Sequence, residues 1–156
     1  MGTVANASDE WIELFNSGDV SADLTGWSLF EGGTHIIGLV GSIEPGGYYL
    51  VERTDDTTVS DITAGVFGPF GGSGLSNAGE DLRLENGTGV IVDEVPCASG
   101  WFAGDAASKT TMERISPWAD GSDPSNWATH TGADYGQDAK GNPINGTPGA
   151  RNSVQI

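Results

Sequence analysis

Short segments in which apolar and polar residues alternate follow one another through most of this 156-residue chain. In residues 11–15, Ile12 and Leu14 would lie on one face of a strand, because successive side chains of a strand point to opposite faces. Trp11, Glu13 and Phe15 would lie on the other face. The same pattern predicts further strands at residues 27–30, 35–40, 48–53, 82–85, 90–95 and 112–115.

Residues that favour tight turns separate these segments, at positions 16–19, 31–33, 44–47 and 86–89. The Asn86-Gly87 pair predicts a hairpin that joins residues 82–85 to residues 90–95. The 25 glycines and 7 prolines also disfavour long helices. Many short strands joined by turns predict an all-β fold, either a sandwich or a barrel.

Acidic residues dominate the charge of the chain. There are 22 Asp and Glu against 6 Lys and Arg, which gives a formal net charge of -16. Such a chain repels nucleic acids and anionic bilayers, and it has no apolar run long enough to cross a membrane. We therefore expect neither nucleic acid partners nor membrane insertion. The length predicts a single domain over residues 1–156.

Residues for catalysis are scarce. The sequence contains two histidines, His35 and His130, and none of the common nucleophile, phosphate-loop or zinc motifs. Both histidines are interpreted as structural. The single cysteine, Cys97, cannot form an internal disulfide and is interpreted as a small buried thiol. The sequence predicts no enzyme activity and no catalytic residue.

Two acidic loops are candidate calcium sites, because calcium prefers carboxylate and carbonyl oxygens. One contains Asp120 and Asp123, and the other contains Asp55 and Asp56. Neither matches a known calcium-loop motif, and turn capping by Asp, Ser and Thr explains both equally well. We expect no cofactor, with calcium as the alternative.

Three tryptophans in the second half of the chain, Trp101, Trp118 and Trp127, would stack on sugar rings if they were exposed. The favoured interpretation is that they anchor the loops.

Several motifs follow one another in a recognisable order. D-E-W-I-E-L-F-N (residues 9–16) and D-L-T-G-W-S-L (23–29) precede P-G-G-Y-Y-L-V (45–51), L-S-N-A-G-E-D-L-R-L (75–84), G-V-I-V-D-E-V (89–95), M-E-R-I (112–115), S-N-W (125–127) and T-P-G-A-R-N (147–152). From about residue 8 to residue 152 this order resembles the lamin-tail domain family, and in particular its prokaryotic members.

The resemblance implies an immunoglobulin-like β-sandwich with long irregular loops in its C-terminal half. It also implies a set of core positions: Ile12, Leu14, Trp27, Leu29, Leu50, Leu82, Leu84, Ile91 or Val92, and Trp127. Trp27 and Leu84 are expected on opposite sides of the sandwich. Residues 97–111 and 129–144 look longer than a minimal family member needs. No catalytic residues belong to the family pattern.

Function follows from the same resemblance, because prokaryotic relatives occur as modules of secreted or surface proteins. The first hypothesis is a non-catalytic extracellular or surface interaction module of a larger prokaryotic protein, which targets or spaces that protein by binding an unknown protein partner. The alternative is a calcium-dependent or glycan-binding β-sandwich module. Either hypothesis places the domain outside the cell or on its surface.

Overall fold

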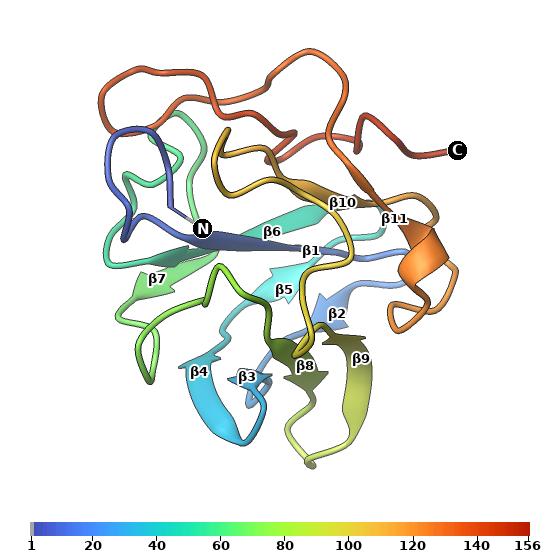
Figure 1. The fold of residues 1–156 in the computed structure, drawn as a ribbon. Coiled ribbons are helices and arrows are strands. Elements are labelled where there is room, and N and C mark those ends of the chain that lie inside the picture. Colours follow the sequence, from blue (N-terminus) through green and yellow to red (C-terminus); the bar gives the residue numbers. More distant parts are fainter. Residues whose placement is uncertain (1) are drawn as a thin grey trace.

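The computed structural model describes residues 2–156, and short β-strands form most of its regular structure (Figure 1). The elements are β1 (Trp11–Phe15), β2 (Ala22–Asp23), β3 (Ser28–Glu31), β4 (Thr34–Gly38), β5 (Ser42–Ile43), β6 (Tyr48–Arg53), β7 (Val66–Gly68), β8 (Asp81–Glu85), β9 (Ile91–Pro96), β10 (Met112–Arg114), the 3-10 helix η1 (Pro124–Asn126) and β11 (Trp127–Thr129). No helix among residues 2–156 is long and apolar enough to span a membrane.

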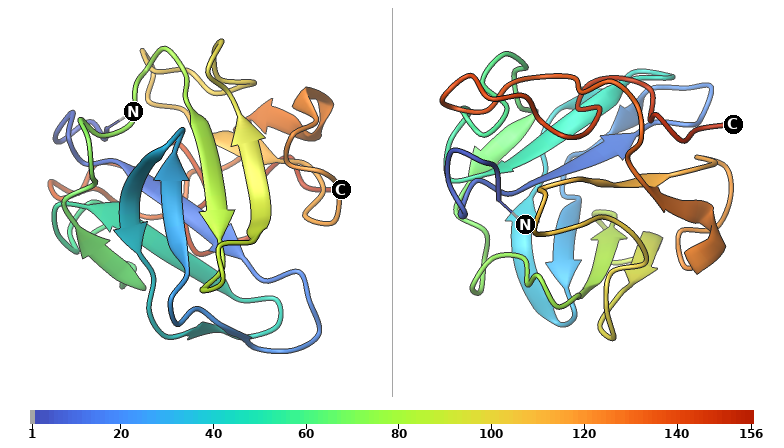
Figure 2. Two further views of the ribbon diagram at one scale, coloured as in Figure 1. Left: turned by 90° about the horizontal axis from the view of Figure 1, so that it is seen from below. Right: turned by 45° about the horizontal axis from the view of Figure 1, so that its top comes forward.

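Two larger sheets face each other across a common core (Figure 2). One is antiparallel and has the order β4-β3-β8-β9. The other has the order β1-β6-β7, in which β1 is antiparallel and β7 parallel to β6. The pairs β2–β5 and β10–β11 form small separate sheets. This arrangement is an immunoglobulin-like β-sandwich, as predicted.

The predicted strands agree closely with the observed ones, and β1 and β6 have the predicted bounds. Four observed strands, β2, β5, β7 and β11, were not predicted, because each has only two or three residues. A segment this short shows at most a weak alternation of apolar and polar residues, and among the strands of two or three residues only β10 was predicted. A neighbouring strand determines whether such a segment becomes part of a sheet.

The predicted hairpin at residues 86–89 is confirmed, because it joins the antiparallel strands β8 and β9. The side chain of Asn86 accepts hydrogen bonds from the backbone N–H groups of Thr88 and Val90, each at 3.0 Å. Gly89 has a φ of 78°, a left-handed conformation that glycine adopts without steric cost. Local turn chemistry therefore accounts for this connection.

The main core lies between the two larger sheets. Its buried members include Leu29 of β3, Ile36 of β4 and Val51 of β6. A second buried cluster, formed by Leu50, Val59 and Ile144, lies on the other face of the β1–β6 pair. Both faces of β6 are thus covered, which explains why its four central residues are all buried.

The core residues expected from the sequence differ in burial. Leu29 and Leu50 are buried, whereas Ile12, Leu14, Trp27, Leu82 and Leu84 are half-buried and pack against the main core. Trp127 is half-buried and belongs to neither buried cluster.

Two expectations about the core are wrong. Ile91 and Val92 are 46% and 49% exposed, because β9 is an edge strand with a neighbour on one side only. Trp27 and Leu84 do not lie in opposite sheets. Trp27 directly precedes β3, and Leu84 of β8 pairs with Leu29 of that same strand. Alternation along one strand shows which residues share a face, but not which sheet the strand joins.

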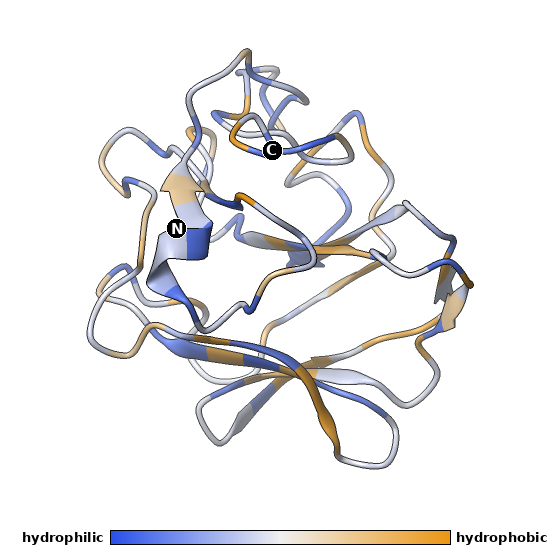
Figure 3. Ribbon diagram, turned by 90° about the vertical axis from the view of Figure 1, so that its right-hand side faces the viewer, coloured by the Kyte–Doolittle hydropathy of each residue, from blue (hydrophilic) through white to orange (hydrophobic). Residues whose placement is uncertain are grey.

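The C-terminal half contains the long irregular loops expected from the sequence, broken by β10, η1 and β11. Figure 3 shows the C-terminus near the top, above the apolar strands at the bottom of the view. Ile144 belongs to the second buried cluster, and the backbone N–H of Gly149 donates a hydrogen bond to Glu13 of β1. The residues after β11, 130–156, are called the C-terminal segment, and this segment therefore covers the outer face of the β1–β6 pair.

Candidate functional site

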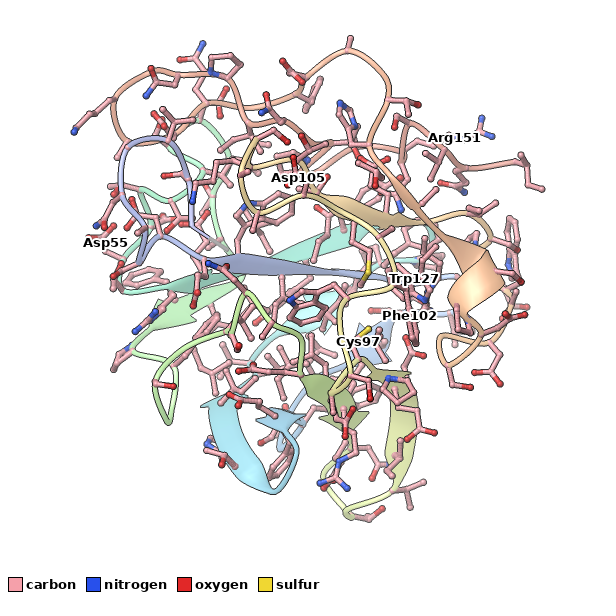
Figure 4. All side chains as sticks on the ribbon, in the orientation of Figure 1. Asp55, Cys97, Phe102, Asp105, Trp127 and Arg151 are labelled. Atoms are coloured by element: carbon pink, nitrogen blue, oxygen red, sulfur yellow. The ribbon has the colours of Figure 1, made fainter. Side chains whose placement is uncertain are left out.

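A groove of about 970 Å3 opens between the sandwich and the C-terminal segment. Residues from β1, β8, β9 and β10 line it, together with parts of the loops at 100–106 and 117–121. In Figure 4, Trp127 is labelled beyond the right-hand end of β1, beside the 3-10 helix η1. The volume lies in the range typical of ligand-binding clefts, about 300–1,000 Å3.

Apolar side chains of the sandwich are left partly uncovered in this groove. Every residue of β1 and of β8 is half-buried, whereas the central residues of β6 are fully buried. Ile12 and Leu14 of β1 and Leu82 and Leu84 of β8 line the groove and also touch the main core. The groove is therefore an open side of the sandwich, where the main core meets solvent.

The backbone of β1 has one free edge, because β1 pairs with β6 only. Just outside the strand, the N–H of Asn16 donates to the C=O of Gly47 at 3.0 Å, and the N–H of Arg53 donates to the C=O of Glu10 at 2.8 Å. Every second pair of an antiparallel ladder exchanges hydrogen bonds. Ile12 and Leu14 therefore bond to β6.

The remaining backbone groups of β1, those of Trp11, Glu13 and Phe15, point away from β6. Within residues 2–156, no hydrogen bond joins these groups to another segment. All three residues line the groove. The free edge of β1 therefore lies along the groove.

Charged side chains around the groove are mostly acidic. Two arginines, Arg83 and Arg114, accompany six acidic residues: Glu13, Asp93, Glu94, Asp105, Glu113 and Asp120. Arg114 forms an ion pair with Asp93 at 2.7 Å, and Arg83 forms one with Glu85 at 3.4 Å. Both arginines are thus partly neutralised. Even when Glu13 is protonated, the other five acids outnumber the arginines, so the groove carries a negative charge that favours cationic ligands.

Glu13 is the most perturbed of these acids. Its Oε2 accepts the hydrogen bond from Gly149, and no partner of its Oε1 lies within residues 2–156. Burial raises the pKa of Glu13 to about 8, partly offset by the bond from Gly149, and the nearby Glu113 raises it further. A carboxyl group that loses water in this way gains stability from a cation placed beside it.

Glu113 of β10, which lines the groove, organises a polar junction. Its Oε1 accepts hydrogen bonds from His130 Nδ1 and Thr147 Oγ1, each at 2.9 Å. Its Oε2 accepts from Ser153 N at 2.8 Å and from Ser153 Oγ at 2.7 Å. This carboxylate is buried and joins β10 to three parts of the C-terminal segment.

Sequence reasoning missed both glutamates as organising residues. A signal was present, because each is a charged residue in the middle of a predicted strand, in W-I-E-L-F and in M-E-R-I. His130, interpreted from the sequence as a structural residue, is buried against Glu113. His35 is exposed, and its Nε2 lies 3.3 Å from Ser28 Oγ.

The three C-terminal tryptophans all line the groove. The indole N–H of Trp101 donates to Ser76 O, and that of Trp127 donates to Gly121 O, each at 2.8 Å. The guanidinium of Arg114 lies 4.7 Å from the ring centre of Trp127. These contacts favour the anchoring interpretation for Trp101 and Trp127. Trp118 also donates its indole N–H, to Ser17 O at 3.3 Å, but the residue is 71% exposed.

The four candidate calcium ligands occupy turns and accept hydrogen bonds there. Asp120 Oδ1 accepts from Ser122 N, which lowers the pKa of Asp120. Asp55 accepts from Thr57, and Asp56 accepts from Ala64 N. Asp55 lies at the left edge of Figure 4, far from Trp127. Among residues 2–156, no three His, Cys, Asp or Glu residues are grouped in a way that would hold a metal ion.

We expect calcium and magnesium, each at about 1 mM, to change the melting temperature equally, because exposed carboxylates attract both as diffuse ions. Asp123 caps η1 and accepts hydrogen bonds from Ser125 N and Oγ, each at 2.8 Å. Asp123→Ala should therefore cost about 1 kcal/mol of unfolding free energy, and Asp120→Ala a similar or smaller amount. A calcium-specific rise of several degrees, lost in both variants, would establish a calcium site instead.

No arrangement of nucleophile, base and orienting acid occurs among residues 2–156. Half-buried Ser28 lies beside His35, and no carboxylate of the described residues hydrogen bonds to that ring. His130 has a carboxylate partner, Glu113, but no hydroxyl in this part of the chain hydrogen bonds to its Nε2. Cys97 is buried, and burial raises the pKa of its thiol, which disfavours the reactive thiolate.

The structure is thus an immunoglobulin-like β-sandwich with a groove along its open side. A model of the Lamin Tail Domain family matches residues 2–98, which is more than half of the chain. The chain therefore belongs to the lamin tail domain family, whose members are generally non-catalytic. No curated protein and no solved structure matches it.

Proposed function

We propose that this domain is a non-catalytic interaction module of a larger prokaryotic protein, located outside the cell or on its surface, and that it binds a partner protein through the groove. The groove is the observation that carries the proposal. It combines uncovered apolar side chains, which supply binding energy when they are buried, with a few charged groups that supply specificity. Membership in a family that is generally non-catalytic supports the same conclusion.

Selection of random peptides displayed on phage tests this proposal. Peptides selected on the whole domain should lose binding to Trp118→Ala and Val92→Asp, which alter exposed groove residues. Two matched variants serve as controls, Phe67→Ala and Val40→Asp, because both residues are exposed outside the groove. The controls should bind normally. If no selected peptide distinguishes the two groups of variants, the groove is not the binding surface.

Glycan binding is the second candidate, and the exposure of Trp118 at the groove rim favours it. An exposed indole offers a flat apolar face to a sugar ring. Binding to a glycan array that Trp118→Ala abolishes and Phe67→Ala preserves would support this candidate.

The location of the domain is tested separately, by protease treatment of intact cells followed by antibody detection of the domain. Protection of the domain would contradict a surface location.

A further inference from the structure

We propose that the groove accepts an extended peptide strand, which hydrogen bonds to the free edge of β1 and places one basic side chain beside Glu13. The partner is thus a segment with apolar side chains at alternate positions and a central Lys or Arg. This inference rests on the proposed function and specifies how the partner binds. Three observations carry it: the unpaired backbone of β1, the uncovered apolar side chains beside it, and the acidic character of the groove.

The backbone of β1 presents a suitable edge. Trp11, Glu13 and Phe15 each direct an N–H and a C=O away from β6, as the register and the flanking hydrogen bonds require. A neighbouring strand would satisfy these groups, which is how an added strand gains affinity. The β1-β6-β7 sheet would then gain a fourth strand next to β1.

One face of the added strand would meet apolar residues. Ile12 and Leu14 project from β1 toward the main core, and Leu82 and Leu84 lie on the facing sheet. All four are half-buried and line the groove. Apolar side chains at alternate positions of the incoming strand would fill the space between these residues and complete the open side of the sandwich.

The other face of the added strand would meet Trp11, Glu13 and Phe15. The carboxyl of Glu13 lies between two aromatic neighbours on this face, and its Oε1 is available. A residue directly opposite Glu13 in a strand pair lies within contact distance of it. A basic side chain there would form a cross-strand ion pair, because a cation beside this desolvated carboxyl lowers its pKa and favours loss of the proton that Glu13 holds in the free domain.

Charge determines which occupant is proposed. A second copy of this chain also has an unpaired β1 edge, but each copy carries a net charge of -16. Two such acidic surfaces repel each other. A peptide with a basic residue gains from the same field, and the acidic residues around the groove outnumber the arginines.

The probe is a synthetic peptide of about nine residues, a typical upper strand length, with valine at every second position, threonine between them and a central lysine. A second peptide has the same sequence, but the backbone nitrogens that would donate hydrogen bonds to β1 carry methyl groups. Binding of both to the whole domain is measured by calorimetry. The methylated peptide should bind about tenfold more weakly or worse, because it cannot donate the hydrogen bonds.

Amide hydrogen exchange locates the contact. With the lysine peptide bound, exchange at Trp11, Glu13 and Phe15 should slow by about tenfold or more, because their N–H groups become hydrogen bonded. The N–H groups of Ile12 and Leu14 already bond to β6, so their exchange should change little.

The variant Glu13→Gln keeps an acceptor for the N–H of Gly149 and should weaken lysine-peptide binding by about two- to fivefold. Glu44→Gln, which removes an exposed charge outside the groove, should have no effect.

The outcomes separate this inference from the proposed function. Equal binding of the two peptides, or unchanged exchange at Trp11, Glu13 and Phe15, overturns strand addition even if phage-selected peptides still require the groove. Sedimentation that shows a dimer, with those three amides protected in the free protein, overturns it in favour of a second copy. Failure of the phage selection to yield groove-dependent peptides overturns the proposed function itself.

Discussion

Lowering the pH from 8 to about 5 should make this domain more stable, with a rise in the free energy of unfolding. One cause is Glu52, whose side chain is fully buried. Burial raises the pKa of Glu52 to about 7 from the ordinary 4.5, although bonds from Val59 N and Thr58 N act in the opposite direction. Burial likewise raises the pKa of Glu13 to about 8, and burial together with Glu31 raises that of Glu80 to about 7.

Stability rises on acidification because the folded chain binds more protons than the unfolded chain. Between pH 8 and 4.5 the folded chain holds protons on these glutamates that the unfolded chain has released, so stability increases as the pH falls. Glu52 alone should contribute about 2–3 kcal/mol. Below about pH 4 the trend should reverse, because turn aspartates such as Asp105 and Asp120, whose pKa values are lowered by hydrogen bonds, then become protonated.

Urea unfolding at several pH values measures this effect. Glu52→Gln should lose about 1–3 kcal/mol at low pH, because one backbone N–H loses its acceptor, and its stability should depend less on pH. Glu44→Gln, at an exposed position, should keep the slope of the parent protein. A stability that increases from pH 5 to pH 8 in the parent would show that these carboxyls are charged and well solvated in the folded state.

Replacing Glu113 by alanine should cost about 3–5 kcal/mol of unfolding free energy, as expected when one partner of a buried ionic group is removed. The variant would leave His130, Thr147 and Ser153 without their common acceptor. It would also separate β10 from the C-terminal segment that covers the β1–β6 pair. Urea denaturation monitored by tryptophan fluorescence gives the value.

Glu94→Ala is the matched control, because Glu94 is exposed and its removal should change stability by less than about 0.5 kcal/mol. Thr147→Val removes a single donor to Glu113 and should cost about 1 kcal/mol. A loss below about 1 kcal/mol in Glu113→Ala would mean that water replaces these hydrogen bonds and that the junction is not a structural link.

Local features of the sequence predicted most of the sandwich. The bounds of β1 and β6, and the hairpin at Asn86, depend on alternation and turn preferences that act within a few residues. The ordered motifs indicated the family, which the match over residues 2–98 confirms. Four of the five strands of two or three residues were missed, because such strands form only where a neighbour supplies the hydrogen bonds.

The burial of individual residues was harder to predict. Leu29 and Leu50 are buried, but Leu82 and Leu84, with the same apolar alternation, are half-buried at the groove. Alternation separates the two faces of a strand, but it does not say whether another layer covers a face. Ile91 and Val92 were misjudged for the same reason, since only the sheet order places β9 at an edge.

The sequence by itself determined an acidic all-β chain with these strands, turns and family motifs, and with no evident catalytic machinery. Only the tertiary structure decided where the open edge and the groove lie. The contacts that define this site join residues distant in sequence, such as Glu13 and Gly149, which are 136 positions apart. Pairing across such distances depends on how whole sheets and loops pack together, whereas sequence patterns report only the preferences of neighbouring residues.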